Sequence, residues 1–232
     1  ALQRIAGQGG MQELGMAEIC NIYGQTEGYG NCCVTPHHWP LAQRASCQGP
    51  PLPGVTVRIR DPETGGDCEP GAVGEIQLRG YLSPGYAGSS AYANAEAFTG
   101  DGFFRSGDLG SLTVEGHLVY AGRISEMIKR SGINVSPAEV EEALQQADGV
   151  AIAGVTGVDD PVKGEIIVAF VVPGPGHEPG PEALRQHCRG LLSSYKVPDQ
   201  IFLKRELPLT PTGKLMRREL RAQATAAIEK DQ

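Results

Sequence analysis

Residues 136–155 read SPAEVEEALQQADGVAIAGV, and this stretch decides the fold of the second half of the chain. Ser136 as the N-cap, Pro137 at the first helical position and Glu139 at N3 form the pattern of a capping box. Gly149 marks the end of the helix, and an apolar run of strand length follows at once. One helical face is apolar at i, i+3, i+4 and i+7, namely at Val140, Ala143, Leu144 and Ala147. The stretch therefore predicts a capped amphipathic helix followed by an apolar strand.

Helix and strand continue to alternate towards the end of the chain. Further apolar runs of strand length lie at 166–172 and 201–203, and helical patterns begin near Pro181 and at Leu215. We expect these elements to form a compact α+β unit of about a hundred residues, which is an ordinary size for one hydrophobic core.

The part before residue 122 differs in character, because short β-rich runs alternate there with glycine and proline. The run at 55–60 alternates apolar and polar residues, as a half-buried strand does, and three others resemble it in length: 20–23, 75–79 and 116–120. The expected fold class is therefore mixed α+β, with a β-rich unit at 1–122 and a smaller α+β unit at 123–232.

Composition limits the classes of function. The 232 residues carry a net charge of -7, with 40% hydrophobic and 20% charged side chains. The negative net charge argues against nucleic acid or an anionic membrane as the partner, because both attract basic surfaces. No apolar run approaches the roughly 20 residues that span a bilayer. No signal peptide is found, so a cytoplasmic location is expected. The six cysteines show no CxxC pair, so we expect reduced thiols and no zinc site.

A loop whose side chains could bind a ligand follows the first expected strand, and it reads Tyr23-Gly24-Gln25-Thr26-Glu27. Its ring can stack a base, its glycine can admit a phosphate, its hydroxyl can donate to that phosphate, and its carboxylate can ligate Mg²⁺. A plain turn is the alternative reading of these five residues.

Two further segments carry polar groups at turns. Residues 104–109, FRSGDL, present Asp108 beside a glycine, where its carboxylate could accept hydrogen bonds from two ribose hydroxyls; an Asx turn is the alternative. Gly122-Arg123 is followed by 128–141, IKRSGINVSPAEVE, which also fits a basic hairpin leading into the capped helix. For Arg130 we keep that structural interpretation.

Lys214 ends the segment 207–214, LPLTPTGK, just before the last expected helix. Two prolines restrict the backbone ahead of it, and Gly213 permits a positive φ immediately before it. Such a lysine is well placed to reach a group outside its own unit, although a solvated lysine at a helix start is the simpler alternative.

Together these segments resemble, in order and spacing, the adenylate-forming superfamily of acyl-CoA synthetases, peptide-synthetase adenylation domains and luciferases. The segments GEIQLRG at 74–80 and YKVP at 195–198 support the resemblance, which covers essentially the whole chain. It implies that residues 1–122 are the C-terminal, β-rich part of the large domain and that 123–232 are the small mobile domain. The hinge is expected near residues 123–125.

The resemblance also implies roles for single residues. Tyr23 would lie against adenine, with Gly24 and Gln25 in the same nucleotide-binding loop. Thr26 would contact the α-phosphate as part of the catalytic machinery, and Glu27 would hold Mg²⁺.

The remaining roles fall on both sides of the hinge. Asp108 and Arg123 would bind the ribose hydroxyls, and Lys214 would be the catalytic lysine of adenylation. The route of the pantetheine arm would be lined by the hairpin residues Lys129, Ser131 and Gly132.

The implied activity is that of an ATP-dependent, AMP-forming acid–CoA ligase, which makes an acyl-adenylate and then a thioester. Its substrates and cofactors would be a small carboxylic acid, ATP/AMP, Mg²⁺ and coenzyme A. The segments 134–141, 160–165 and 195–198 resemble CoA ligases more than peptide-synthetase domains. A stand-alone adenylation domain that loads a carrier protein, a non-catalytic binding module and a luciferase-type oxidation remain open alternatives.

Departures from the family pattern matter too. Ser125 takes the hinge position where Asp or Lys is usual, and Ser106 replaces the commoner Thr. The Ser/Thr/Gly-rich phosphate loop and most of the acyl pocket do not occur in these residues, and the chain begins at Ala1 within what reads as a helix tail. We therefore expect a C-terminal portion that associates with a missing N-terminal half and cannot turn over ATP alone.

Overall fold

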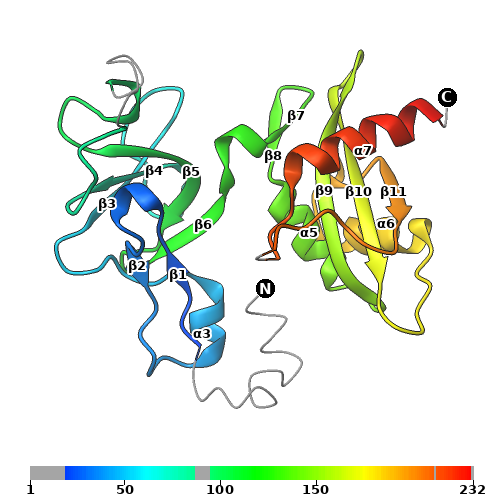
Figure 1. Cartoon of the computed structure of the whole chain (residues 1–232), viewed down its shortest axis with the longest axis horizontal. Coiled ribbons are helices and arrows are strands. Elements are labelled where there is room, and N and C mark those ends of the chain that lie inside the picture. The colour runs from blue at the N-terminus through cyan, green and yellow to red at the C-terminus, as the bar shows by residue number, and fades with distance from the viewer. Residues whose placement is uncertain (1–18, 87–94, 212, 231–232) are drawn as a thin grey trace. The chain divides into compact units, whose positions relative to one another are not determined.

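The computed structural model describes residues 19–86, 95–211 and 213–230. The described chain divides into two compact units, of which the first ends at Ile124 and the second begins at Ser125 (Figure 1). The helix tail expected at the start of the chain lies outside the described residues. None of the described helices is long and apolar enough to cross a membrane.

The first unit is built on an antiparallel sheet of four strands in the order β3-β4-β5-β6. The strands span Thr56–Arg60, Gly74–Arg79, Phe104–Leu112 and Leu118–Arg123. A two-stranded ladder of β1 (Ile22–Tyr23) with β2 (Cys33–Val34) and the helix α3 (Leu41–Ser46) precede it. The buried side chains of one core cluster come from both sheets, among them Tyr23, Cys33, Ile59, Ile76, Leu78, Phe104 and Leu118.

One expectation for this unit is wrong. The segment around Asp108 is not a glycine turn: β5 runs through it for nine residues and pairs with β4 on one side and β6 on the other. Gly107 has φ 69° and lies between Arg105 and Leu109, where the register of β5 with β4 shifts, so the glycine sits at an irregularity inside the strand. Pairing on both edges outweighs the local turn signal.

In the residues that the structure describes, the second unit combines one sheet with three α-helices (Figure 1). Its strands follow the path β11-β10-β7-β8, and β9 pairs with β10. In chain order the elements are β7 (Ile128–Arg130), β8 (Ile133–Val135), α5 (Pro137–Gln145), β9 (Val150–Asp160), β10 (Gly164–Pro173), α6 (Pro181–Leu191), β11 (Gln200–Leu203) and α7 (Arg217–Lys230). The whole chain is thus of the mixed α+β class, as the sequence predicts.

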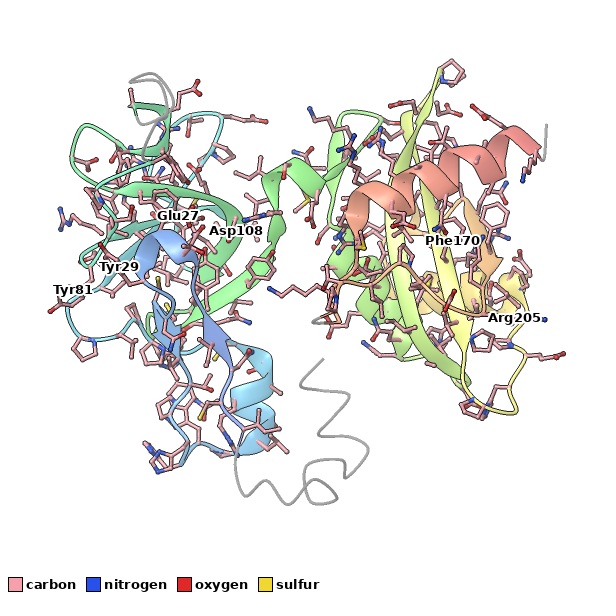
Figure 2. The ribbon with its side chains drawn as sticks, in the orientation of Figure 1. Glu27, Tyr29, Tyr81, Asp108, Phe170 and Arg205 are labelled. Atoms are coloured by element: carbon pink, nitrogen blue, oxygen red, sulfur yellow. The ribbon has the colours of Figure 1, made fainter. Side chains whose placement is uncertain are left out.

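From Ile166 to Val172 the strand β10 is apolar without interruption, because helices cover both of its faces there. Ile167, Ala169 and Val171 share a cluster with buried residues of α5 and α6. Val168 and Phe170, which alternate with them, share a second cluster with buried residues of α7 (Figure 2). The period of two along one strand therefore fixes which helix lies on which face.

The helix α5 begins where the capping pattern predicts, with Ser136 as the N-cap and proline at the first turn, but the capping box itself is not formed. Ser136 makes no side-chain capping hydrogen bond. Glu139 instead receives two hydrogen bonds from Lys196 Nζ, at 2.6 Å and 2.8 Å. An ammonium partner satisfies this carboxylate better than a backbone N–H does. The helix also ends at Gln145, four residues before Gly149.

Candidate functional site

The loop after β1 is shaped by close backbone contacts. Thr26–Gly28 form a single 3₁₀ turn, and Tyr29 follows it with φ 53°. The N–H groups of Gly28 and Gly30 both donate to the carbonyl of Gln25, at 3.0 Å and 3.1 Å. A Cβ at Gly24 would lie 1.5 Å from the carbonyl oxygen of Gly30. Position 24 therefore requires glycine if the loop is to close in this form.

We expect Gly24→Ala to lower the free energy of unfolding of the first unit by about 1–3 kcal/mol, the usual cost of forcing atoms into filled space. Urea unfolding followed by circular dichroism measures the loss. Gly100→Ala is the matched control, because a Cβ there meets no atom within 4 Å. Equal stability of the two variants would contradict the close approach at Gly24.

The carboxylate of Asp108 is held from two sides. Tyr23 Oη donates to Asp108 Oδ2 at 2.9 Å, and Arg123 Nε donates to Oδ1 at 3.0 Å. The backbone N–H of Asp108 donates to Ser106 Oγ at 3.0 Å. The Asp108 side chain is 9% exposed and that of Arg123 is 51% exposed. Asp108 is thus fixed in orientation beside a cation that still reaches solvent, which is an arrangement able to receive a vicinal diol.

Tyr23 belongs to the core more than to the surface, since only 6% of it is exposed. Burial raises the pKa of its phenol well above the ordinary value, so the hydroxyl remains a donor to Asp108 at any physiological pH. Gln25 Nε2 donates to the hydroxyl oxygen of Tyr23 at 3.3 Å. Beside it lies the more exposed ring of Tyr120, with a centroid separation of 6.1 Å.

Thr26 is exposed, and Glu27 is partly buried on the same short turn. Tyr86 Oη donates to Glu27 Oε1 at 2.7 Å. Figure 2 labels Glu27 and Asp108, which belong to the same unit. Among the described residues, no group of three or more His, Cys, Asp or Glu side chains could enclose a metal ion. A single carboxylate fits Mg²⁺ only as the ion usually binds with nucleotides, through one or two carboxylates, phosphate oxygens and water.

The hairpin β7–β8 lies on the second unit. Its two-residue turn, Ser131-Gly132, has φ 50° and 81°, as a type I′ turn requires. Lys129 is exposed on the strand before the turn, and Ser131 N–H donates to the carbonyl of Lys163 at 2.7 Å. Arg130 forms a two-point ion pair with Asp199, at 2.6 Å and 2.9 Å, which supports the structural role expected for it.

Lys214 lies on a tight turn ahead of α7. The carbonyl of Lys214 accepts from Thr210 N–H at 2.8 Å, and its own N–H donates to Thr210 Oγ1 at 3.0 Å. Gly213 has φ 79°, the positive value that its place before the lysine suggested. Within the described part of the chain, the Lys214 ammonium forms no ion pair. Its backbone is therefore held while its charge is left unneutralised.

Arg217, at the start of α7, anchors this region to the rest of the second unit. Its Nε donates to Glu126 Oε2 at 3.0 Å, and its Nη2 donates to Glu141 Oε2 at 3.1 Å. A further hydrogen bond runs from Nη1 to Glu141 Oε1, and another from Nη1 to the carbonyl of Val155 at 3.0 Å. Glu126 directly follows the residues where a hinge is expected, so this arginine ties the start of the second unit to the helix α7 behind Lys214.

The structure brings Tyr23, Gln25, Asp108 and Arg123 into one bonded group on the first unit. The hairpin and Lys214 are held separately on the second unit. Two residues near these groups were not singled out by sequence: Tyr86, which donates to Glu27, and Arg217, which follows Lys214 by three residues and bonds to Glu126 and Glu141. The glycine and serine around Tyr86 read only as loop, and Arg217 lies among several basic residues, so neither carried a signal of its own.

Two family models match the chain. The model "AMP-binding enzyme" matches residues 7–87, and "AMP-binding enzyme C-terminal domain" matches residues 139–214. These matched segments include the loop at 23–27 and Lys214, respectively.

Several named proteins are similar over most of the chain. The fatty acid–[acyl-carrier-protein] ligase ScoC of Streptomyces coeruleorubidus is 37% identical over 88% of this chain and 39% of its own length. The 2-succinylbenzoate–CoA ligase of Geobacillus kaustophilus is 37% identical over 88% of this chain and 41% of its own. The structure of the Bacillus subtilis o-succinylbenzoate CoA synthetase MenE with ATP and magnesium matches with a TM-score of 0.77 and 32% identity, over 90% of this chain and 42% of that one. The chain thus spans about two fifths of the length of these relatives.

Proposed function

Because the chain belongs to the AMP-binding, adenylate-forming enzyme family, we propose that it supplies part of an AMP-forming ligase that couples a carboxylic acid to coenzyme A. The observation that carries this proposal is the fixed carboxylate of Asp108, held by Tyr23 at 2.9 Å and by Arg123 at 3.0 Å. Among common nucleotide contacts, an oriented and negatively charged acceptor suits the two hydroxyls of a ribose.

In the first step the acid attacks the α-phosphate of ATP, forming a carboxylate–phosphate bond and releasing pyrophosphate. Two anions must approach each other, so positive charge and hydrogen-bond donors stabilise the transition state. Thr26 offers a hydroxyl from the exposed turn, and Lys214 offers an ammonium with no competing ion pair among the described residues. Glu27 would hold Mg²⁺, which supplies further charge neutralisation at the phosphates.

In the second step the thiol of coenzyme A attacks the acyl carbon, and AMP leaves. The hairpin with Lys129, Ser131 and Gly132 is the segment proposed to line the route of the pantetheine arm. Its two positive φ values leave a narrow, glycine-containing turn at the tip. Exposed Lys129 stands beside that tip, where it could attract the phosphates of the cofactor. A hinge near residues 123–125 would let the two steps use different faces of the small unit.

The acceptor deserves a direct test, since one similar protein is a carrier-protein ligase and another is a CoA ligase. The protein that carries this chain is incubated with ATP, Mg²⁺ and a panel of carboxylic acids, with either coenzyme A or a phosphopantetheinylated carrier protein. Mass spectrometry of the products is expected to find AMP and an acyl-CoA. If only the carrier protein is acylated, coenzyme A is not the acceptor and the chain belongs to a carrier-protein ligase instead. If no acid yields AMP, the proposed ligase activity is overturned.

A further inference from the structure

The segment at 83–86 is fastened to the turn that carries Glu27 at two points. Ser83 N–H donates to the backbone carbonyl of Glu27 at 2.7 Å. Three residues further on, Tyr86 Oη donates to the side-chain oxygen Oε1 of the same residue, also at 2.7 Å. One hydrogen bond fixes where the backbone of Glu27 lies, and the other fixes the direction of its carboxylate.

The segment has its own local structure. Ser83 Oγ donates to the carbonyl of Gly85 and accepts from the N–H of Gly85, both at 3.2 Å. This small ring sets the spacing between Ser83 and Tyr86, so that both can reach the same glutamate. Tyr86 is 42% exposed, so its contact with Glu27 is a surface contact beside the site and not a consequence of core packing.

Only one of the two carboxylate oxygens of Glu27 accepts a hydrogen bond from the described residues. Tyr86 occupies Oε1, whereas Oε2 has no hydrogen-bond partner in the part of the chain that the structure describes. A glutamate held at one oxygen loses much of its rotamer freedom before any ligand arrives. Partners outside the first ligand shell commonly orient metal-binding carboxylates in this way.

We propose that Tyr86 is a positioning residue that directs the free oxygen of Glu27 towards the Mg²⁺ carried by the nucleotide. This inference rests on the proposed function, in which Glu27 is the metal ligand. Tyr86 itself touches neither the metal nor the reacting atoms. Its hydroxyl acts only through the orientation of the glutamate, so its removal should affect metal binding more than the chemical step.

The test uses Tyr86→Phe in the protein that carries this chain, with Mn²⁺ as the probe. Electron paramagnetic resonance measures the affinity of the protein–ATP complex for Mn²⁺. We expect this affinity to fall about tenfold, as for loss of one hydrogen bond to a charged group. The Mg²⁺ concentration that half-saturates acid-dependent ATP–pyrophosphate exchange should rise about tenfold as well, with little change in kcat at saturating Mg²⁺.

Tyr81→Phe is the matched control, because Tyr81 lies five residues earlier, is 71% exposed and packs beside Gly54. It should match wild type in both measurements. If Tyr86→Phe binds Mn²⁺ as tightly as wild type or more tightly, the inference is overturned while the proposed function stands. A wild-type protein that binds no Mn²⁺ with ATP and shows no exchange would overturn both. Equal loss in both tyrosine variants would mean a general effect on the segment, which also overturns the inference.

Discussion

Lys214→Ala, in the protein that carries this chain, is expected to slow acid-dependent ATP–pyrophosphate exchange by about 10²–10³-fold, or roughly 3–4 kcal/mol of transition-state stabilisation. The side chain is exposed, and its ammonium has no ion pair among the described residues. No nearby partner therefore holds the charge away from a bound nucleotide. The turn itself depends on backbone groups of Lys214 and on Thr210, so truncation at Cβ leaves the turn intact.

The same variant separates the two half-reactions. Thioester formation from a chemically synthesised acyl-adenylate does not involve the α-phosphate attack, so we expect that rate to stay near the wild-type value. Lys230→Ala is the matched control, because Lys230 is an exposed lysine at the far end of the following helix. Exchange that is unchanged in Lys214→Ala, or equally reduced in both variants, would remove Lys214 from the catalytic machinery.

Elements with strong periodic patterns were predictable from sequence. The helices that begin at Pro181 and near Leu215 and the strands at 55–60, 75–79 and 166–172 are present with small shifts of their ends. The nine-residue strand β5 was not predictable, because Ser106, Gly107 and Gly110 give it the local character of a turn. Only its pairing with β4 and β6, which are distant in sequence, makes it a strand.

In the candidate site, too, contacts between residues far apart in the sequence were not predictable. The motifs identified Tyr23 and Asp108 separately, but their hydrogen bond joins residues 85 positions apart and depends on the packing of both sheets. The role of Tyr23 illustrates the difference: sequence suggested a ring that faces adenine, whereas the structure reveals a buried ring with its hydroxyl on Asp108. The adenine contact stays a prediction, and the contact with Asp108 is a role that composition and spacing do not encode.

A second large effect is expected at Arg217, whose guanidinium is shared by Glu126 and Glu141. Glu141 is almost fully buried, with a side chain 11% exposed, and it also accepts from Val155 N–H at 2.8 Å. Arg217→Met keeps the length of the side chain but leaves Glu141 without its cation. Removing one partner of such a buried pair typically costs about 3–5 kcal/mol of stability. Urea unfolding of the second unit measures the loss.

The size of this loss should depend on pH. Burial raises the pKa of Glu141, and Arg217 partly offsets the rise; without the arginine the folded-state pKa of Glu141 goes higher still. A carboxyl group with a raised folded-state pKa destabilises the fold while it is ionised. The deficit of Arg217→Met should thus be largest at neutral pH and shrink as the pH falls towards the unfolded-state value of about 4.3.

The double variant Arg217→Met/Glu141→Gln is the decisive comparison. It removes the buried charge together with its partner, and the glutamine can still accept from Val155 N–H, so most of the lost stability should return at neutral pH. As the pH falls, Arg217→Met and the double variant should converge, because protonated Glu141 and glutamine are both neutral acceptors. If the double variant is as unstable as Arg217→Met at pH 7, the loss comes from the missing contacts of the arginine with Glu126 and Val155. The buried charge of Glu141 would then not be the cause.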